Sequence, residues 1–61
     1  MTVKEFFETL LTSRVFDVEI YNLNNDEEYT GTTETITESD MLDCEIINWD
    51  IYRASFNMTV C

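Results

Sequence analysis

The carboxylates are the side chains in this sequence with the most capacity for chemistry. Thirteen Asp and Glu residues accompany three Lys and Arg residues, and there is no His. A catalytic carboxylate pair needs one acid held in an apolar pocket, and the usual general base in proteins is His. The acids within the predicted strands alternate onto the solvent-facing side, and no stretch of the sequence marks a pocket. We therefore expect no catalytic residue, and the protein is predicted not to be an enzyme.

Residues that could hold a metal or a cofactor are equally sparse. A single Gly excludes a glycine-rich phosphate loop, and two Cys without His do not have the spacing of a zinc site. The run Asn24–Glu28 has oxygen ligands but neither the spacing nor the Gly of a calcium loop, so we interpret it as a solvated turn. The sequence predicts no metal and no cofactor.

The two cysteines, Cys44 and Cys61, bear on the cellular compartment. No basic stretch followed by an apolar run opens the sequence, so no signal peptide is expected, and no apolar run approaches the ~20 residues of a membrane span. Thiols in such a chain are typical of a reducing cytoplasm. We predict two free thiols in a cytoplasmic protein, with Cys44 filling a small buried or half-buried space and Cys61 at a frayed end.

The first element that must position the acids is a helix over Thr2–Thr12. Thr2 followed by Glu5 is a capping-box pattern, in which each side chain serves a backbone amide of the other residue. Apolar residues recur at the spacing of one helical face, which predicts a core-facing stripe. That stripe consists of Val3, Phe6, Phe7, Leu10 and Leu11.

Alternation with a period of two predicts a strand over Val15–Leu23 and a second, short strand over Glu28–Thr32. The apolar face of the first strand holds Phe16, Val18 and Ile20, and its wet face holds Asp17, Glu19 and Tyr21. The segment Asn22–Glu28 between the strands is rich in residues that favour turns. Gly31 marks a bulge or a close approach of another group.

The strongest strand pattern lies in Glu45–Val60, which predicts two strands joined by a turn at Tyr52–Ser55. The apolar face holds Ile47, Trp49, Ile51, Phe56, Met58 and Val60, and the wet face holds Asn48, Asp50, Tyr52, Asn57 and Thr59. Trp49, the only Trp, lies mid-strand on the apolar face. We therefore predict that Trp49 forms the centre of the core.

The connection Thr33–Asp43 is the least regular stretch. Thr37 and Asp40 have the spacing of a second helix cap, which introduces one helical turn whose Met41 and Leu42 could plug an open edge of the core. A helix lying across one face of a sheet buries the apolar faces of both, and short connections favour a meander. The predicted fold class is therefore α+β, in a single domain over residues 1–61. One N-terminal helix packs on a mostly antiparallel four-stranded meander sheet, in the order αββ(short α)ββ.

The net charge of −10, with a pI of about 4.1, is the feature with functional content. A hydrophobic content of 44% argues against the disorder that is common in short acidic chains. Negative charge keeps small proteins soluble, but this imbalance is large for the length and the acids occur in every predicted element. The sign of the charge opposes direct binding to nucleic acid, because phosphates are repelled.

The size of the charge suggests what the surface could imitate. A compact chain of this length has a radius of gyration of ~10.5 Å and a diameter of about 27 Å. Duplex DNA carries one charge per ~1.7 Å of its axis, so the same length holds about sixteen charges, the same order as the protein's ten. Side chains such as Asp17 and Glu19 stand ~6.6–6.8 Å apart along a strand, similar to the step between phosphates. The protein could therefore occupy a basic channel built for a nucleic acid.

The opening MTVKEFFETLL, the later VEIY and the Tyr-x-Gly at Tyr29 resemble the small acidic α+β proteins of phages and mobile elements of Firmicutes. The resemblance is one of size, charge and sequence style over the whole chain. Those proteins include anti-CRISPR proteins and other inhibitors of host nucleic-acid enzymes, several of which imitate DNA. The resemblance implies a non-catalytic acidic inhibitor that binds a basic nucleic-acid-binding or recognition channel of a host defence nuclease, such as a CRISPR effector.

On this hypothesis the partner is a basic protein, with no direct contact to nucleic acid or membrane, and the chain acts as a monomer or homodimer. Carboxylates on the wet face and at the hairpin tip would meet Arg and Lys of the partner, and two Tyr side chains would act as anchors. The predicted partner-binding residues are Asp17, Glu19, Tyr21, Asp26, Glu27, Glu28, Asp50 and Tyr52.

The alternative is a small protein–protein interaction or homodimerisation module with no role in nucleic-acid enzymes. Its contact patch would consist of apolar residues expected on the wet face. These are Val15, Tyr21, Leu23, Ile46 and Tyr52. Binding by charge weakens steeply as ionic strength rises and binding by an apolar patch does so much less, which separates the two hypotheses.

Overall fold

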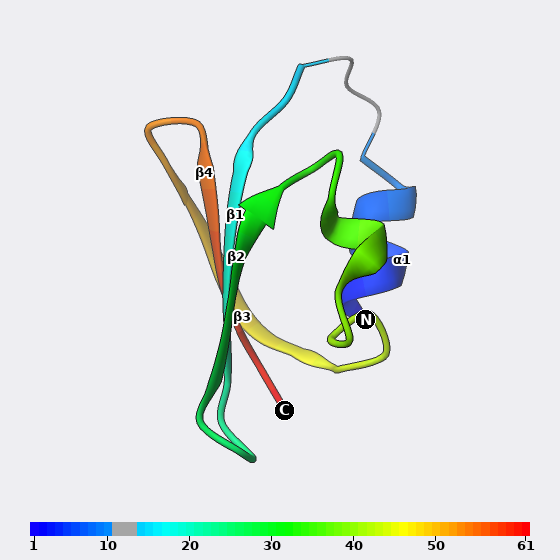
Figure 1. The fold of residues 1–61 in the computed structure, drawn as a ribbon, viewed down its shortest axis with the longest axis vertical. Coiled ribbons are helices and arrows are strands. Elements are labelled where there is room, and N and C mark those ends of the chain that lie inside the picture. The colour runs from blue at the N-terminus through cyan, green and yellow to red at the C-terminus, as the bar shows by residue number, and fades with distance from the viewer. Residues whose placement is uncertain (11–13) are drawn as a thin grey trace.

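A computed structural model describes residues 1–10 and 14–61 of the chain. In chain order the elements are α1 (Val3–Glu8), β1 (Asp17–Asn22), β2 (Glu27–Thr32), the one-turn 3-10 helix η1 (Ile36–Glu38), β3 (Ile46–Tyr52) and β4 (Ser55–Val60). The helices lie together on one side of a four-stranded sheet, and no described element covers the opposite side (Figure 1). The predicted α+β class is confirmed.

The strands lie in the order β2-β1-β4-β3, and the sheet is mixed. β1 is antiparallel to β2 but parallel to β4, which is in turn antiparallel to β3. The prediction of a mostly antiparallel meander is wrong, because the connection between β2 and β3 is not short. Residues 33–45 pass along the helix side and deliver the β3–β4 hairpin to the far edge of β1 (Figure 1). A parallel pair needs a crossover of this kind.

The helix α1 begins as predicted and ends earlier. The backbone N–H of Thr2 donates to Glu5 Oε1 at 3.0 Å, and the backbone N–H of Glu5 donates to Thr2 Oγ1 at 3.2 Å, so the capping box is confirmed. The helix stops at Glu8 with Thr9 as its C-cap. The Thr9 hydroxyl donates to the Phe6 carbonyl at 2.9 Å, a side-chain bond that competes with the helical backbone pattern.

Four residues of the predicted apolar stripe of α1 face the core. Val3 is fully buried, and Phe6, Phe7 and Leu10 are half-buried against the core. Leu11 and Thr12, also part of the predicted helix, lie outside the described residues.

The core lies between the helices and the two central strands. Its buried apolar residues are Val3, Val18, Ile20, Ile36, Met41, Phe56, Met58 and Val60. Alternate residues of β1 and β4 face it, as the period of two predicts. The two central strands therefore supply most of the sheet's contribution to the core.

Trp49 is not the centre of the core, and that prediction is wrong. Its ring centroid lies 5.0 Å from that of Phe6, so it is on the helix side as expected, but 49% of the residue is exposed. β3 is an edge strand, and a six-residue helix spans only ~9 Å, too little to cover the whole sheet. Ile47 and Ile51 of the same strand are about half exposed for the same reason.

Phe56 takes the central place that Trp49 was expected to have. It is 2% exposed, and four other aromatic rings have their centroids 5.4–6.4 Å from its own. These rings belong to Phe6, Phe7, Phe16 and Trp49.

The alternation of β3 is interrupted near its start. The register with β4 shifts between Ile46 and Asn48, which places Ile46 opposite the buried Val60. Ile46 consequently packs against the core, and the prediction that it lies on the wet face is wrong. A bulge of this kind adds one residue to a strand and reverses the face of the residues before it.

The irregular connection supplies the expected plug. Met41 is 5% exposed and Leu42 packs against the core, as predicted. The helical turn is η1, which follows Thr35, so Thr37 lies within the turn and the prediction that it caps one is wrong. The polar contact that orders the next residues comes from Ser39, whose Oγ accepts from the backbone N–H of Met41 at 3.0 Å.

Gly31 marks a close approach, one of the two readings predicted for it. A Cβ at this position would lie 2.7 Å from Thr35 Oγ1 and would also collide with the hydroxyl of Tyr29. That hydroxyl and the Thr35 carbonyl are 3.0 Å apart in a hydrogen bond, so the space above Gly31 is filled by a contact that orders the connection after β2.

Both cysteines are free thiols, as predicted. Cys44 is half-buried against the core, and its sulfur accepts a hydrogen bond from Asn22 Nδ2 at 3.5 Å. Cys61 is exposed, but its backbone exchanges two hydrogen bonds with Glu45, so its backbone is paired rather than frayed. None of the described helices is long and apolar enough to span a membrane.

The turn between β3 and β4 provides the first stability prediction. Arg53 and Ala54 have φ angles of 51° and 59°, the left-handed pair that a two-residue type I′ hairpin requires and that Gly adopts without strain. We expect Ala54→Gly to raise the free energy of unfolding by about 0.5–1 kcal/mol, since relief of strain exceeds the added entropy of the unfolded chain. Urea denaturation measures the change. Ala54→Val is the destabilised control. A glycine variant less stable than the parent would contradict the turn geometry.

Candidate functional site

The side of the sheet away from the helices forms one continuous polar surface, which we call the open face. Its side chains are those that alternate with the buried residues of each strand. The open face consists of Glu28, Thr30 and Thr32 of β2, Asp17, Glu19 and Tyr21 of β1, Ser55, Asn57 and Thr59 of β4, and Asn48, Asp50 and Tyr52 of β3.

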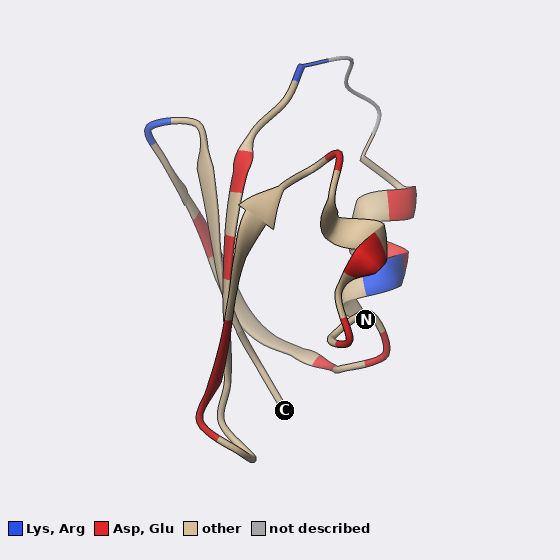
Figure 2. Cartoon of the chain, viewed as in Figure 1, with Lys and Arg blue, Asp and Glu red and all other residues tan. Residues whose placement is uncertain are grey.

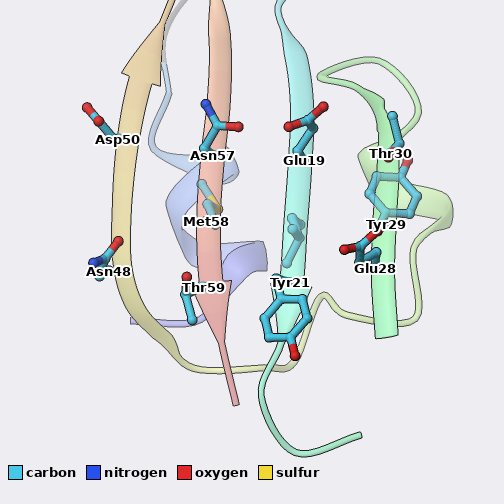
Figure 3. Close-up of a pocket in the computed structure, with 11 residues that line it drawn as sticks. Glu19, Tyr21, Glu28, Tyr29, Thr30, Asn48, Asp50, Asn57, Met58 and Thr59 are labelled. Carbon is cyan, nitrogen blue, oxygen red and sulfur yellow. The ribbon is translucent and has the colours of Figure 1, made fainter. Parts of the chain in front are cut away.

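The strand register arranges these side chains in rows across the sheet. Glu19 is opposite Asn57, and Asn57 is opposite Asp50, so two carboxylates flank one amide (Figure 3). With strands ~4.8 Å apart, the backbones of Glu19 and Asp50 are separated by roughly 10 Å. A neighbouring row of the open face contains Glu28, Tyr21, Thr59 and Asn48.

A shallow hollow of about 340 Å³ lies over these rows and is open to solvent. Residues from all four strands line it, among them Glu19, Asp50, Asn57 and Tyr21 (Figure 3). Carboxylate, amide and hydroxyl oxygens accept hydrogen bonds, and a carboxylate binds a guanidinium with two parallel bonds. The hollow therefore suits Arg or Lys side chains of a partner better than an anionic ligand.

The charged residues of the open face are all acidic. Its carboxylates, those of Asp17, Glu19, Glu28 and Asp50, are exposed and form no ion pair within the described part of the chain. The basic residues lie outside the strands: Lys4 is on α1, Arg14 precedes β1, and Arg53 is at the hairpin turn (Figure 2). The guanidinium of Arg53 is over the Tyr52 ring, 5.3 Å from its centroid.

Six of the eight predicted partner-binding residues are gathered on the open face. These are Asp17, Glu19, Tyr21, Glu28, Asp50 and Tyr52. The other two are placed differently. Glu27 is opposite the buried Asn22 and so belongs to the helix side of β2, whereas Asp26 lies in the β1–β2 turn with a φ of 55°.

Sequence reasoning missed the amide and hydroxyl groups that complete the surface. Asn57 and Thr59 of β4 stand between the acids of β1 and those of β3. Their period-two pattern placed them on the wet side, but only the pairing of β4 with β1 brings them to the middle of the site. No local signal in the sequence specifies that pairing.

The apolar patch of the alternative hypothesis is not assembled. Val15 and Leu23 are both about half exposed, but they lie beyond opposite ends of β1, eight positions and roughly 26 Å apart along an extended chain. Tyr52 is exposed on β3, and Ile46 packs against the core. These residues do not form one contact surface.

Tyr21 connects the open face to the turn that holds Asp26. Its hydroxyl donates a hydrogen bond to the Asp26 carboxylate. This bond raises the pKa of Tyr21 above its ordinary value of 10.0, with smaller contributions in the same direction from desolvation and from the charge of Glu28. The bonded phenol is the protonated form, so the contact stabilises the fold below pH 10.0 and is lost as the pH rises through the raised pKa of Tyr21.

This bond gives the second prediction. We expect Asp26→Asn to lower the pKa of Tyr21 toward 10.0, because an amide stabilises the phenol less than a carboxylate does. Asn tolerates the left-handed backbone of this position, so the turn is retained. An NMR titration of the three Tyr rings measures the pKa, with Tyr29 and Tyr52 as internal controls. A Tyr21 titration identical in the two proteins would show that the bond is absent in solution.

A scan against protein-family models matched no family, and searches of curated proteins and of solved structures returned no similar protein. The functional argument therefore depends on the geometry and charge of the open face.

Proposed function

We propose that the protein is a non-catalytic acidic inhibitor whose open face binds the basic nucleic-acid-binding or recognition channel of another protein. A host defence nuclease such as a CRISPR effector is the class of target. The observation that carries the proposal is the sheet face that no described element covers, on which Asp17, Glu19, Glu28 and Asp50 form no ion pair with another described residue.

The dimensions of the molecule support imitation of a nucleic acid. Its radius of gyration is 10.4 Å and its longest extent is 31 Å. Duplex DNA of that length carries about eighteen phosphates, at one charge per ~1.7 Å of axis. The protein carries a net charge of −10, so a channel that neutralises phosphates with Arg and Lys meets a negative charge of the same order, a little more than half that of the duplex.

The arrangement of the acids supports recognition of a folded basic surface. The sheet fixes the backbone positions of the exposed acids, so less entropy is lost on binding an Arg or Lys array than a flexible acidic chain would lose. Charge complementarity also accelerates association and excludes acidic partners. Tyr21 and Tyr52, at either end of the open face, would supply aromatic anchors of the kind that dominate interface energies.

The resemblance to phage and mobile-element inhibitors agrees with this function. Such a protein gains its effect by occupying the channel in stoichiometric amounts, which requires no catalytic group, metal or cofactor.

The proposal is tested by capture followed by competition. The immobilised protein is exposed to a bacterial lysate from which nucleic acid has been removed by nuclease, and bound proteins are identified by mass spectrometry. Guide-loaded CRISPR effectors are tested in parallel as purified complexes. We expect the captured proteins to have basic nucleic-acid-binding surfaces and to lose binding of a labelled duplex as the acidic protein is added. Capture of partners whose nucleic-acid binding is unaffected would refute the proposal.

A further inference from the structure

The outer edge of β3 is a further surface with no strand partner among the described residues. β3 pairs with β4 on one side, and no described strand pairs with its other side. The first backbone donor along that edge is already used, because the Ile46 N–H donates to the Met1 carbonyl at 2.9 Å. Along residues 47–52 no described strand pairs with this edge.

Two residues of β3 direct their backbone N–H and C=O groups outward, away from β4. The two-residue turn makes Tyr52 and Ser55 a hydrogen-bonded pair, so Tyr52 and, two residues before it, Asp50 direct their backbone groups toward β4. Trp49 and Ile51 therefore direct theirs outward. In agreement, the Ile51 N–H donates to no described strand. Its acceptor is Oδ1 of the neighbouring Asp50, at 2.8 Å.

The side chains of the same edge are apolar and accessible. Ile47, Trp49 and Ile51 are 52%, 49% and 48% exposed. Edge strands are usually protected by charged side chains, especially Lys, by Pro, by a bulge or by a covering segment. β3 contains neither Lys nor Pro, and its register shift lies near its first residue, away from Trp49 and Ile51. A strand edge that pairs with no described strand and carries exposed apolar side chains is able to accept another strand, whose carbonyl would replace Asp50 Oδ1 as the acceptor of the Ile51 N–H.

We propose that β3 accepts an extended strand of the basic partner, which adds to the sheet in antiparallel orientation. This inference rests on the proposed function for the charge of the partner. In an antiparallel pair, opposite residues have their side chains on the same side of the sheet. Partner residues opposite Trp49 and Ile51 meet the apolar helix side, and the residue between them meets Asp50 on the open face. The strand that fits alternates apolar with Lys or Arg residues.

A second copy of this chain fits the edge less well. It carries the same net charge of −10, and pairing Trp49 with Ile51 of the copy sets the two Asp50 side chains directly opposite each other. Like charges in that position destabilise a strand pair. A basic strand instead places a cation beside Asp50.

The test uses fluorescein-labelled peptides and the full-length protein. The probe is Lys-Val-Lys-Ile-Lys-Val-Lys, and a control peptide has the same residues with the Lys grouped at one end. Two further peptides carry backbone N-methyl groups, one on every apolar residue and one on every Lys. The apolar residues of the peptide lie opposite Trp49 and Ile51, and their backbone N–H groups donate hydrogen bonds to β3. We therefore expect methylation of the apolar residues to weaken binding by about tenfold or more. Methylation of the Lys residues, whose N–H groups point away from β3, should have little effect. The grouped control should bind as weakly as the first methylated peptide.

A variant of the protein gives the reciprocal test. Ile51→Pro removes an outward N–H without breaking the ladder with β4, and Pro is tolerated on an edge strand. Ile51→Ala, which retains the N–H, is its control, and circular dichroism verifies that both are folded. We expect the Pro variant to bind the alternating peptide more weakly than the Ala variant.

Two results would overturn the inference. Equal binding of all four peptides would mean that charge alone attracts them, which refutes strand addition but leaves the proposed function of the open face intact. A dimer in sedimentation equilibrium that the alternating peptide does not dissociate, and that Ile51→Pro abolishes, would show that a second copy occupies the edge.

Discussion

Replacing Phe56 with Ala is expected to lower the free energy of unfolding by about 3–5 kcal/mol, which would unfold a large share of the molecules at 25 °C. Phe56 is 2% exposed in a central strand, and rings from α1, β3 and the segment before β1 surround it. Its removal leaves a cavity that these rings cannot all fill. A chain of 61 residues has little stability to spare for such a loss.

Trp49→Ala is the matched comparison. Trp49 is larger than Phe56, but about half of it is exposed, so we expect a smaller loss of roughly 1.5–2.5 kcal/mol. Chemical denaturation followed by far-ultraviolet circular dichroism, which does not depend on the lost Trp, measures both. A loss for Trp49→Ala equal to or larger than that for Phe56→Ala would mean that α1 covers β3 more fully than the structure shows.

Neutralising three acids of the open face is expected to weaken binding of the basic partner by roughly a hundredfold or more. The variant combines Asp17→Asn, Glu19→Gln and Asp50→Asn, which preserve the size of each side chain. A charge-assisted hydrogen bond contributes ~1.5 kcal/mol or more, and the partner's Arg and Lys would lose several. Folding should not suffer, since the exchange lowers the repulsion within a chain of net charge −10.

The control variant removes the same amount of charge from the helix side. It combines Glu34→Gln, Glu38→Gln and Asp43→Asn, three exposed residues of the connection between β2 and β3. Only long-range attraction changes in this variant, so we expect a loss of affinity below about fivefold at physiological salt. Isothermal titration calorimetry with the captured partner measures both variants. Equal losses would show that net charge, and not the open face, determines binding.

Local patterns predicted the parts of this fold that depend on near neighbours. The capping box of Thr2 and Glu5, the apolar faces of β1 and β4, and the turn between Tyr52 and Ser55 all depend on residues a few positions apart. Helical and strand periodicity determine them directly. The same periodicity placed Asp17, Glu19 and Asp50 on the solvent side correctly.

The features that were not predictable depend on how distant segments meet. β1 pairs with β4 because residues 33–45 cross the helix side, and nothing within either strand specifies that partner. The exposure of Trp49 follows from the edge position of β3, which is itself a consequence of the strand order. The row in which Asn57 separates Glu19 from Asp50 has the same origin, so the acids were identified individually but their arrangement was not.

The salt dependence of association decides most directly whether the open face binds by charge. The association constant of the protein with its captured partner is measured over a series of sodium chloride concentrations, for the parent and for both neutralised variants. Binding by the open face predicts that the constant falls steeply as salt rises, and that the fall is markedly shallower for the open-face variant than for the control variant. An association constant that is nearly independent of salt, with no difference between the variants, would contradict it.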